Sequence, residues 1–217
     1  MKVALTGGIA CGKSLLSKFL NELGVETLDA DDVVHTLLPD PEERRRIAAE
    51  VFADPEKRKE LEARLHPIVK ERIDEWLSLS QNGFNAATQR SREAESLSGS
   101  GAQPQFSKPA PSAPLRLCVK NSVLKIAVIP LLFEAHWEKN FDIICCVASS
   151  RETQIERMIA TRGMSRAEAE ARLAAQLPVE EKARRSHYVI RNDGTADELR
   201  AEAQKLVAWL KTSTLQL

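Results

Sequence analysis

Short apolar runs alternate with segments of helical periodicity along most of the chain. The apolar runs predict strands at residues 2–5, 25–28, 123–130, 141–147 and 188–190. Between them, apolar residues recur every three or four positions and predict helices near residues 15–23, 151–161, 165–176 and 195–211. The first strand, a glycine-rich turn, a helix and the second strand form a βαβ unit, which requires parallel strands. The pattern therefore predicts an α/β fold with a parallel five-stranded sheet.

Two segments interrupt this alternation. Residues 37–79 are charged and helical in period, and Pro67 suits the first turn of a helix that carries Ile68, Val69, Ile73 and Trp76. Residues 80–114 are rich in Ser, Gly, Gln, Ala and Pro, a composition too polar to offset the entropy of ordering. We expect one domain over residues 1–217, with a core at 1–36 and 115–217, a helical region at 37–79 and a disordered insertion at 80–114.

Composition and charge exclude several classes of function. The chain has 217 residues, 43% of them hydrophobic, which is enough to bury one sizeable core. Its 31 basic residues balance 31 acidic ones, so it has no bulk positive field for nucleic acid or an anionic membrane surface. It contains no apolar run of about 18 residues and no secretory apolar region at its start. We expect a cytoplasmic protein with a small-molecule substrate, no nucleic-acid or membrane partner, and a monomeric or weakly homo-oligomeric state.

The clearest chemical signal is the segment GGIACGKS at residues 7–14, which fits the pattern GxxxxGK[ST]. It lies between the first strand and the first helix, where backbone N–H groups and the helix N-terminus can cradle a phosphate. Lys13 can reach the β- and γ-phosphates, and the Ser14 hydroxyl can bind Mg²⁺. A chance glycine turn is the alternative. The sequence predicts a site for ATP and Mg²⁺ formed by Gly7, Gly8, Ala10, Cys11, Gly12, Lys13, Ser14 and Leu15.

The four cysteines show neither a CxxC motif nor the Cys/His spacing of zinc sites; they are Cys11, Cys118, Cys145 and Cys146. We expect buried thiols rather than disulfides or metal ligands. Cys11 lies near a helix N-terminus, which can lower the pKa of a thiol and would suit a redox switch. A small residue that fills a position in the loop is the simpler interpretation, and we favour it.

Three carboxylates, Asp29, Asp31 and Asp32, follow the second strand. They lie at the carboxyl edge of the predicted sheet, where open α/β folds bind their ligands. A carboxylate there can orient an acceptor hydroxyl and take its proton, or hold a water on Mg²⁺. An Asp can instead cap the next helix. We expect both roles, with Asp31 chemical and Asp29 or Asp32 structural.

Five segments, TGGIACGKS, LDADDVVH, LHPIV, IPLLFE and YVIRNDG, occur in this order and together resemble the dephospho-CoA kinase family. The resemblance covers almost the whole chain except the insertion. It implies transfer of the ATP γ-phosphate to the ribose 3′-hydroxyl of dephospho-CoA, and a three-layer P-loop kinase fold with a helical substrate domain and a helical lid. One alternative is another P-loop kinase, for a nucleoside monophosphate or a small metabolite. A nucleotide-binding switch module is a further alternative, but the sequence has no NKxD motif.

The resemblance also implies residue roles. Asp31, which matches the second Asp of the family's DAD segment, would be the catalytic base. Region 37–79 would bind the substrate, and dephospho-CoA would be seated by His66, Pro130, Leu131, Leu132, Phe133 and Glu134. Without the resemblance, His66 would be a histidine at a helix start and the apolar residues of the segment would be simple core.

A lid is implied at residues 155–176, where Arg157, Arg162, Arg166 and Arg172 could reach triphosphate oxygens after closure. We expect Arg157 to be catalytic, with Lys13, and Arg162 to bind the nucleotide. The alternative is a solvated helix pair in which Glu156, Glu168 and Glu170 are the partners. Asn192 and Gly194 resemble the family's loop on the adenine side, although Asn-Asp-Gly is also an ordinary turn sequence.

Overall fold

The fold is an open parallel sheet of five strands. The computed structural model describes residues 1–37, 40, 42, 46–47, 54–95 and 123–213. The strands are β1 (Val3–Gly7), β2 (Glu26–Asp29), β3 (Lys125–Val128), β4 (Ile143–Ala148) and β5 (Tyr188–Arg191). Their order in the sheet is β2-β3-β1-β4-β5, and every pairing is parallel. The predicted α/β fold with a parallel five-stranded sheet is confirmed.

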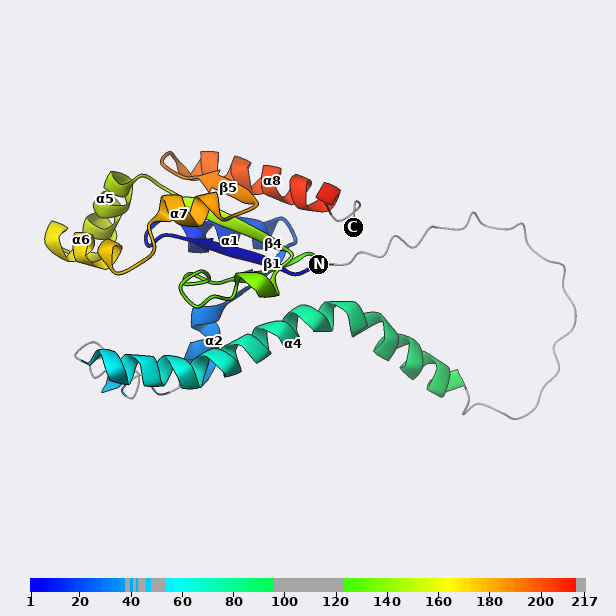
Figure 1. Cartoon of the computed structure of the whole chain (residues 1–217). Helices are drawn as coiled ribbons and strands as arrows, with labels where there is room; N and C mark the ends of the chain where they lie inside the picture. The colour runs from blue at the N-terminus through cyan, green and yellow to red at the C-terminus, as the bar shows by residue number, and fades with distance from the viewer. Residues whose placement is uncertain (38–39, 41, 43–45, 48–53, 96–122, 214–217) are drawn as a thin grey trace, which may run out of the picture.

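Helices cover both faces of this sheet. They are α1 (Lys13–Glu22), α2 (Ala30–Leu37), α4 (Pro55–Glu95), α5 (Arg151–Arg162), α6 (Arg166–Ala174), α7 (Val179–Arg184) and α8 (Ala196–Ser213). Figure 1 shows α8 on one side of the sheet and α4 on the other. Helices α5 and α6 lie beyond the carboxyl ends of the strands, so they stand over the edge where ligands bind in such folds (Figure 1).

Alternation along β1 divides the core into two layers. Val3 and Leu5 belong to a buried cluster that includes residues of α1 and α8. Ala4 belongs to a second cluster, which includes Val33 of α2 and Ile73 of α4. Because successive residues of a strand point to opposite faces, one apolar strand holds both layers together. This packing accounts for the continuous apolar runs in the sequence.

Helix α4 differs from its expected form in two ways. Pro67 lies inside the helix rather than in its first turn, since α4 already begins at Pro55. An interior proline leaves the carbonyl four residues earlier without its N–H donor, so the packing of Val69 and Ile73 against the sheet must offset that loss. The helix also continues to Glu95, into the first part of the expected insertion. Residues 80–95 contain helix formers such as Ala, Gln, Arg and Glu, whereas the Gly- and Pro-rich part begins later, at residues outside the described ones.

Within the described part of the chain, no helix is long and apolar enough to span a membrane. Cys11, Cys145 and Cys146 are free and buried, as expected, and Cys118 lies outside the described residues.

Candidate active site

The phosphate-binding loop connects β1 to α1 and needs glycine at two positions. Gly7 has φ +150°, and a Cβ there would lie 2.3 Å from the Val147 carbonyl oxygen. Gly12 has φ +91°, and its Cβ would lie 2.3 Å from Nδ2 of Asn192. Gly12 is also the N-cap of α1, so no side chain caps the first turn. The N–H groups of the first turn of α1 therefore have no side-chain cap and can bind an anion.

Residues from later segments hold the loop in place. Asn192 is 6% exposed and donates from Nδ2 to the Cys11 carbonyl at 2.8 Å. Gln154, on α5, donates from Nε2 to the Ile9 carbonyl at 2.7 Å. Ser149 lies just after β4 and donates to the Asn192 carbonyl at 2.6 Å. The loop is thus fixed by residues that follow β4 and β5, at the same edge of the sheet.

Lys13 lies against its own loop. Its Nζ donates to the carbonyl oxygens of Gly7 at 3.1 Å and Gly8 at 2.8 Å. Burial lowers the pKa of the Lys13 ammonium, and the positive charge of Lys182 lowers it further, whereas the Asp29 carboxylate acts to raise it. A phosphate anion would favour the charged form of Lys13, because an opposite charge stabilises a buried ammonium.

Cys11 belongs to the structure of the loop. The residue is buried in the core cluster that includes Leu16 of α1. Burial raises the pKa of the Cys11 thiol, and the nearby charge of Lys13 only partly opposes that shift. A buried, protonated thiol is a poor nucleophile, so the geometry supports a space-filling role rather than a redox switch.

The three aspartates that follow β2 lie in different environments. Asp29 ends β2, and its Oδ1 accepts a hydrogen bond of 2.9 Å from the Asp31 N–H at the start of α2. Burial raises the pKa of the Asp29 carboxyl, and this hydrogen bond opposes the shift. Asp31 and Asp32 are exposed in the first turn of α2. The structure therefore gives Asp29 the helix-capping role and leaves the Asp31 carboxylate accessible.

The arginines of α5 and α6 point in different directions. Arg157 is directed at the loop, since its Nη1 lies 3.4 Å from the Ala10 carbonyl and 3.2 Å from Ser149 Oγ. Arg166 instead forms a two-bond pair with Glu152, at 2.8 Å for each bond, and lies 3.3 Å from Glu170. Its side chain is thus engaged on the helix surface, as in the alternative that the sequence left open. Of the partners expected there, Glu170 takes part, while the main partner, Glu152, was not among them.

Arg172 and Arg162 complete this set. Arg172 lines a cleft beside the loop, while Arg162 is exposed at the end of α5. The helix pair packs on the loop through Ile155, Met158 and Ala169, which contact Ile9 and Ala10. Movement of α5 would therefore be transmitted to the phosphate-binding loop.

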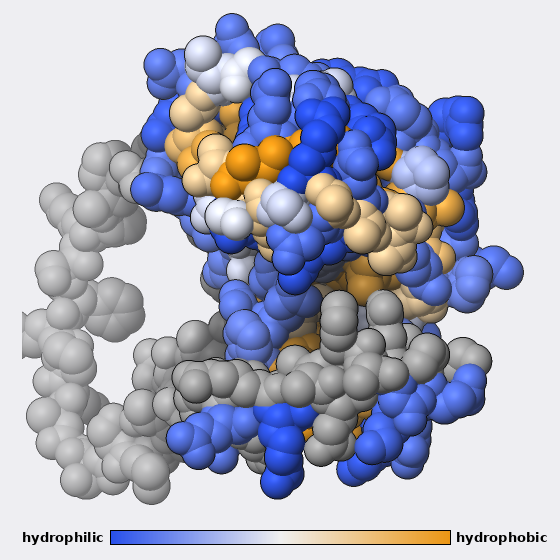
Figure 2. Space-filling model, turned by 90° about the vertical axis from the view of Figure 1, so that its left-hand side faces the viewer, coloured by the Kyte–Doolittle hydropathy of each residue, from blue (hydrophilic) through white to orange (hydrophobic). Residues whose placement is uncertain are grey.

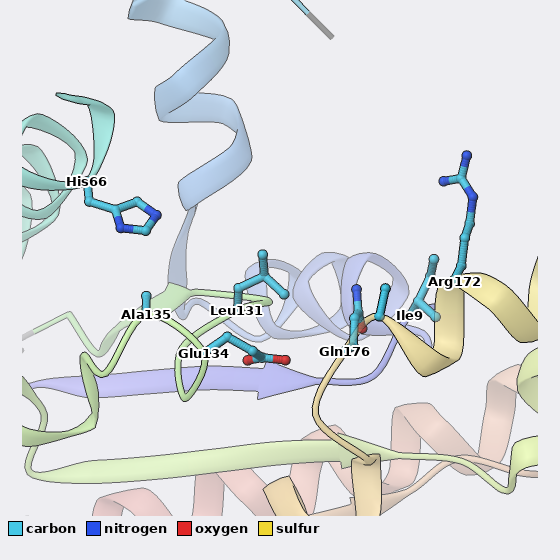
Figure 3. Close-up of a pocket in the computed structure, with 8 residues that line it drawn as sticks. Ile9, His66, Leu131, Glu134, Ala135, Arg172 and Gln176 are labelled. Carbon is cyan, nitrogen blue, oxygen red and sulfur yellow. The ribbon is translucent and has the colours of Figure 1, made fainter. Parts of the chain in front are cut away.

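The cleft next to the phosphate loop has a volume of about 290 Å³. It is lined by Ile9, His66, Leu131, Glu134, Ala135, Arg172, Ala175 and Gln176. Figure 3 shows that His66 approaches from α4 on one side and Arg172 stands on the other, with the loop after β3 between them. Hydrophobic surface gathers among hydrophilic residues on this side of the molecule (Figure 2). His66 also stacks edge-on against Trp137, with ring centroids 5.3 Å apart.

The segment after β3 is divided between cleft and core. Leu131 and Glu134 line the cleft, whereas Leu132 and Phe133 are 0% and 2% exposed and belong to the core. Pro130 contributes its carbonyl, which accepts hydrogen bonds from Thr6 Oγ1 at 3.2 Å and Lys182 Nζ at 2.9 Å. Leu131 and Glu134 thus lie where a ligand in the cleft could touch them, while Leu132 and Phe133 pack in the core. That the segment seats the acceptor stays a prediction.

Three further residues of the site, Gln154, Ser149 and Lys182, were not identified from the sequence. Ser149 follows the apolar run of β4 at the carboxyl edge, the same position relative to a strand that drew attention to Asp29. Gln154 and Lys182 lie on helices, and each contacts a residue far away in sequence. Their residue types alone carried no signal.

The residues present fit a bound Mg²⁺. Ser14 is exposed in the first turn of α1, and its hydroxyl and the carboxylates of Asp29 and Asp31 are the oxygen donors that Mg²⁺ prefers. Among the described residues, no three His, Cys, Asp or Glu side chains cluster as a metal cage. Mg²⁺ usually keeps waters and phosphate oxygens as ligands, so a cage is not required.

A glycine-rich loop at a helix N-terminus, on a parallel sheet with a helix pair over its edge, defines a P-loop kinase. A family model for dephospho-CoA kinase matches residues 1–43 and 115–198. A dephospho-CoA kinase from Synechococcus sp. (strain JA-3-3Ab) is 34% identical over 94% of this chain and 90% of its own length. The chain therefore belongs to the dephospho-CoA kinase family.

Solved structures agree on the fold. A dephospho-CoA kinase from Campylobacter jejuni superposes with a TM-score of 0.62 at 21% identity, covering 99% of this chain and 100% of that one. A shikimate kinase from Acinetobacter baumannii superposes with a TM-score of 0.54 at 15% identity, covering 99% of this chain and 94% of that one. At these identities the likeness establishes the shared architecture and not the acceptor.

Proposed function

We propose that this protein transfers the γ-phosphate of ATP to the ribose 3′-hydroxyl of dephospho-CoA, giving coenzyme A and ADP. The observation that carries the proposal is the position of the acceptor-side cleft directly beside the phosphate loop, in a chain of the dephospho-CoA kinase family. Ile9 belongs to both, so an acceptor in the cleft would lie next to the γ-phosphate. Productive geometry of this kind supplies much of the rate enhancement in phosphoryl transfer.

The chain's own residues can divide the chemistry between them. The loop N–H groups and Lys13 would hold the β- and γ-phosphates, and Arg157 would add positive charge near Ala10. Mg²⁺, when held by Ser14 and the phosphates, would neutralise charge on the transferring group. The acceptor oxygen would bond to the γ-phosphorus while the bond to the β–γ bridging oxygen breaks, and the Asp31 carboxylate would receive the hydroxyl proton.

A comparison of acceptors tests this proposal. ADP release would be measured with dephospho-CoA, AMP, dCMP, shikimate and gluconate at equal concentrations and saturating ATP. We expect dephospho-CoA to be preferred by at least about a hundredfold in kcat/KM, the scale of discrimination that buried polar contacts can provide. Preference for any of the other four acceptors would assign the chain to a different acceptor class on the same fold.

A further inference from the structure

Lys182 is a buried charge that the proposed chemistry does not use. Its side chain is 0% exposed, although lysine is among the residues most rarely buried. It belongs to α7, a helix of six residues that contacts β4 and β1. Burying an ammonium is costly, and well-packed apolar residues often serve stability as well or better. Its position therefore calls for a reason other than packing.

The Lys182 ammonium binds two groups of the segment after β3. Nζ donates to the Pro130 carbonyl at 2.9 Å and lies 2.7 Å from Glu134 Oε1. The same Oε1 accepts the Leu177 N–H at 3.1 Å, so α7 and the chain just before it hold Glu134 at two points. Thr6, at the end of β1, provides the second donor to the Pro130 carbonyl. The two ends of the segment Pro130–Glu134 are thus fixed to the core.

One oxygen of Glu134 remains without a hydrogen-bond partner. The Oε2 atom is buried, and no donor among the described residues forms a hydrogen bond with it. A carboxylate oxygen readily accepts more than one hydrogen bond. Glu134 lines the cleft, and Figure 3 shows its carboxylate directed toward the Gln176 side of that space. An unpaired buried carboxylate oxygen costs free energy unless a ligand supplies the donor.

We propose that Lys182 is a positioning residue for the acceptor substrate, which fixes the segment 130–134 and neutralises Glu134 so that Oε2 can accept a hydrogen bond from a hydroxyl or amino group. This inference rests on the proposed function. Both substrates of that reaction are anionic, and a bare carboxylate in the cleft would repel them. The ion pair with Lys182 removes the repulsion and leaves one accepting oxygen.

Kinetics of matched variants test the proposal. Lys182→Met should raise the KM for dephospho-CoA about tenfold or more, because the lost contacts are those of Nζ with Pro130 and Glu134. The KM for ATP should change less than about threefold, because Lys182 makes no hydrogen bond to the phosphate loop and acts on Lys13 through its charge alone. Lys182→Arg, which keeps the charge, should recover part of the acceptor affinity. Lys205→Met is the control, since this lysine is 66% exposed and pairs with Glu202 at the same distance of 2.7 Å.

Loss of stability must be separated from loss of positioning. Lys182→Met leaves the Glu134 carboxylate without its counter-charge and should lower the melting temperature, whereas Lys182→Met/Glu134→Gln removes both charges and should recover most of it. We expect the KM for dephospho-CoA to stay at least about fivefold raised in the double variant, because the Pro130 carbonyl keeps the Thr6 hydroxyl but has lost the Lys182 ammonium as a donor. Recovery of that KM together with the melting temperature would overturn the positioning role, as would equal increases in both KM values.

Hydrogen exchange gives a readout that does not depend on turnover. The amides of Ala135, His136 and Trp137 are hydrogen-bonded within the loop, to Leu131, Phe133 and Leu132. These amides should exchange at least about tenfold faster in Lys182→Met, whereas their exchange rates should not change in Lys205→Met. A wild-type protein that cannot phosphorylate dephospho-CoA would refute the proposed function alone, and unchanged exchange in Lys182→Met would refute the inference alone.

Discussion

Lys13 and the three aspartates show how neighbouring charged residues acquire different roles. The ammonium of Lys13 is already desolvated and held by two loop carbonyls. Asp29 is the carboxylate whose charge acts on Lys13, but its Oδ1 is occupied by the cap of α2. Asp31 is exposed and its carboxylate is accessible to an acceptor. Lys13 is therefore placed to act on phosphate, and Asp31 is the aspartate of the three that is best placed to act on an acceptor.

Lys13→Ala should reduce kcat by at least about 10²- to 10³-fold, because a preorganised positive group at the transferring phosphoryl is lost. Stability should change little, since the substitution also removes a buried charge whose pKa burial has lowered. Steady-state kinetics and thermal melting measure the two effects. Lys18→Ala, on the exposed face of the same helix, is the control and should retain the parental rate.

Asp31→Asn should lower kcat by about 10²- to 10⁴-fold and leave the KM for ATP nearly unchanged, because a group that acts on the acceptor hydroxyl contributes in the transition state. Asp32→Asn, in the same exposed turn, should stay active. Asp29→Ala should cost about 1 kcal/mol of stability as a lost cap. An inactive Asp29→Asn beside a fully active Asp31→Asn would move the base to the buried carboxylate.

Among the helices, the pair α5 and α6 presents one face to the phosphate loop and another to solvent. Ser150 caps α5 and Gly163 ends it, while Ser165 and Glu168 form a capping box at the start of α6. These local signals fix the ends of both helices. The inner face carries Arg157 toward the loop, and the outer face pairs Arg166 with Glu152. The arginines are thus separated by helix face rather than by sequence position.

Arg157→Ala should therefore decrease kcat/KM for ATP by about 10²-fold or more, because it removes a positive charge directed at the phosphate loop. Arg166→Ala removes only a solvent-exposed ion pair, so it should change the rate less than about threefold and leave the melting temperature nearly unchanged. Initial rates at varied ATP compare the two variants. Equal losses in both would show that the helix pair closes and that Arg166 leaves Glu152.

Elements were predictable from the sequence where a local pattern defined them. All five strands were found. The apolar runs of β1, β3 and β4 are almost entirely buried between the two helical layers. The edge strands β2 and β5 are more exposed, but each still places an apolar residue, Leu28 or Ile190, against the core. Helix α7 was missed because six residues give too short a period, and the start of α4 was misplaced because a proline is usually taken as a helix beginning.

The phosphate loop was predictable for the same reason, since one continuous motif encodes it. Its supports were not. The hydrogen bonds of Asn192 to Cys11 and of Gln154 to Ile9 join segments far apart in sequence, and only the folded sheet brings them together. Such contacts leave no periodicity or motif in the sequence.

At the scale of the whole molecule, the chain leaves the core along α4 and returns at β3. Lys125, the first residue of β3, donates from Nζ to the Trp76 carbonyl at 2.9 Å, and its charge lies 4.7 Å from the centre of the Trp76 ring. The departing and returning segments are therefore adjacent at this point. Among the described side chains of α4, the core contacts end at Leu77. The family model also passes over residues 44–114.

Replacement of residues 81–111 by a short Gly/Ser linker should consequently leave the melting temperature, kcat and both KM values within about twofold of the parent. The linker needs to bridge only a short distance, because Trp76 and Lys125 are already in contact, and closing a loop costs little extra when its length changes. Ile73→Ala is the positive control: this residue is 2% exposed, and its truncation should cost about 2–5 kcal/mol. Thermal melting and the dephospho-CoA assay measure both proteins. A deletion variant that melts normally but has lost affinity for dephospho-CoA would place part of the acceptor site in residues 81–111, whereas one that unfolds like Ile73→Ala would show that the second half of α4 contributes to the core.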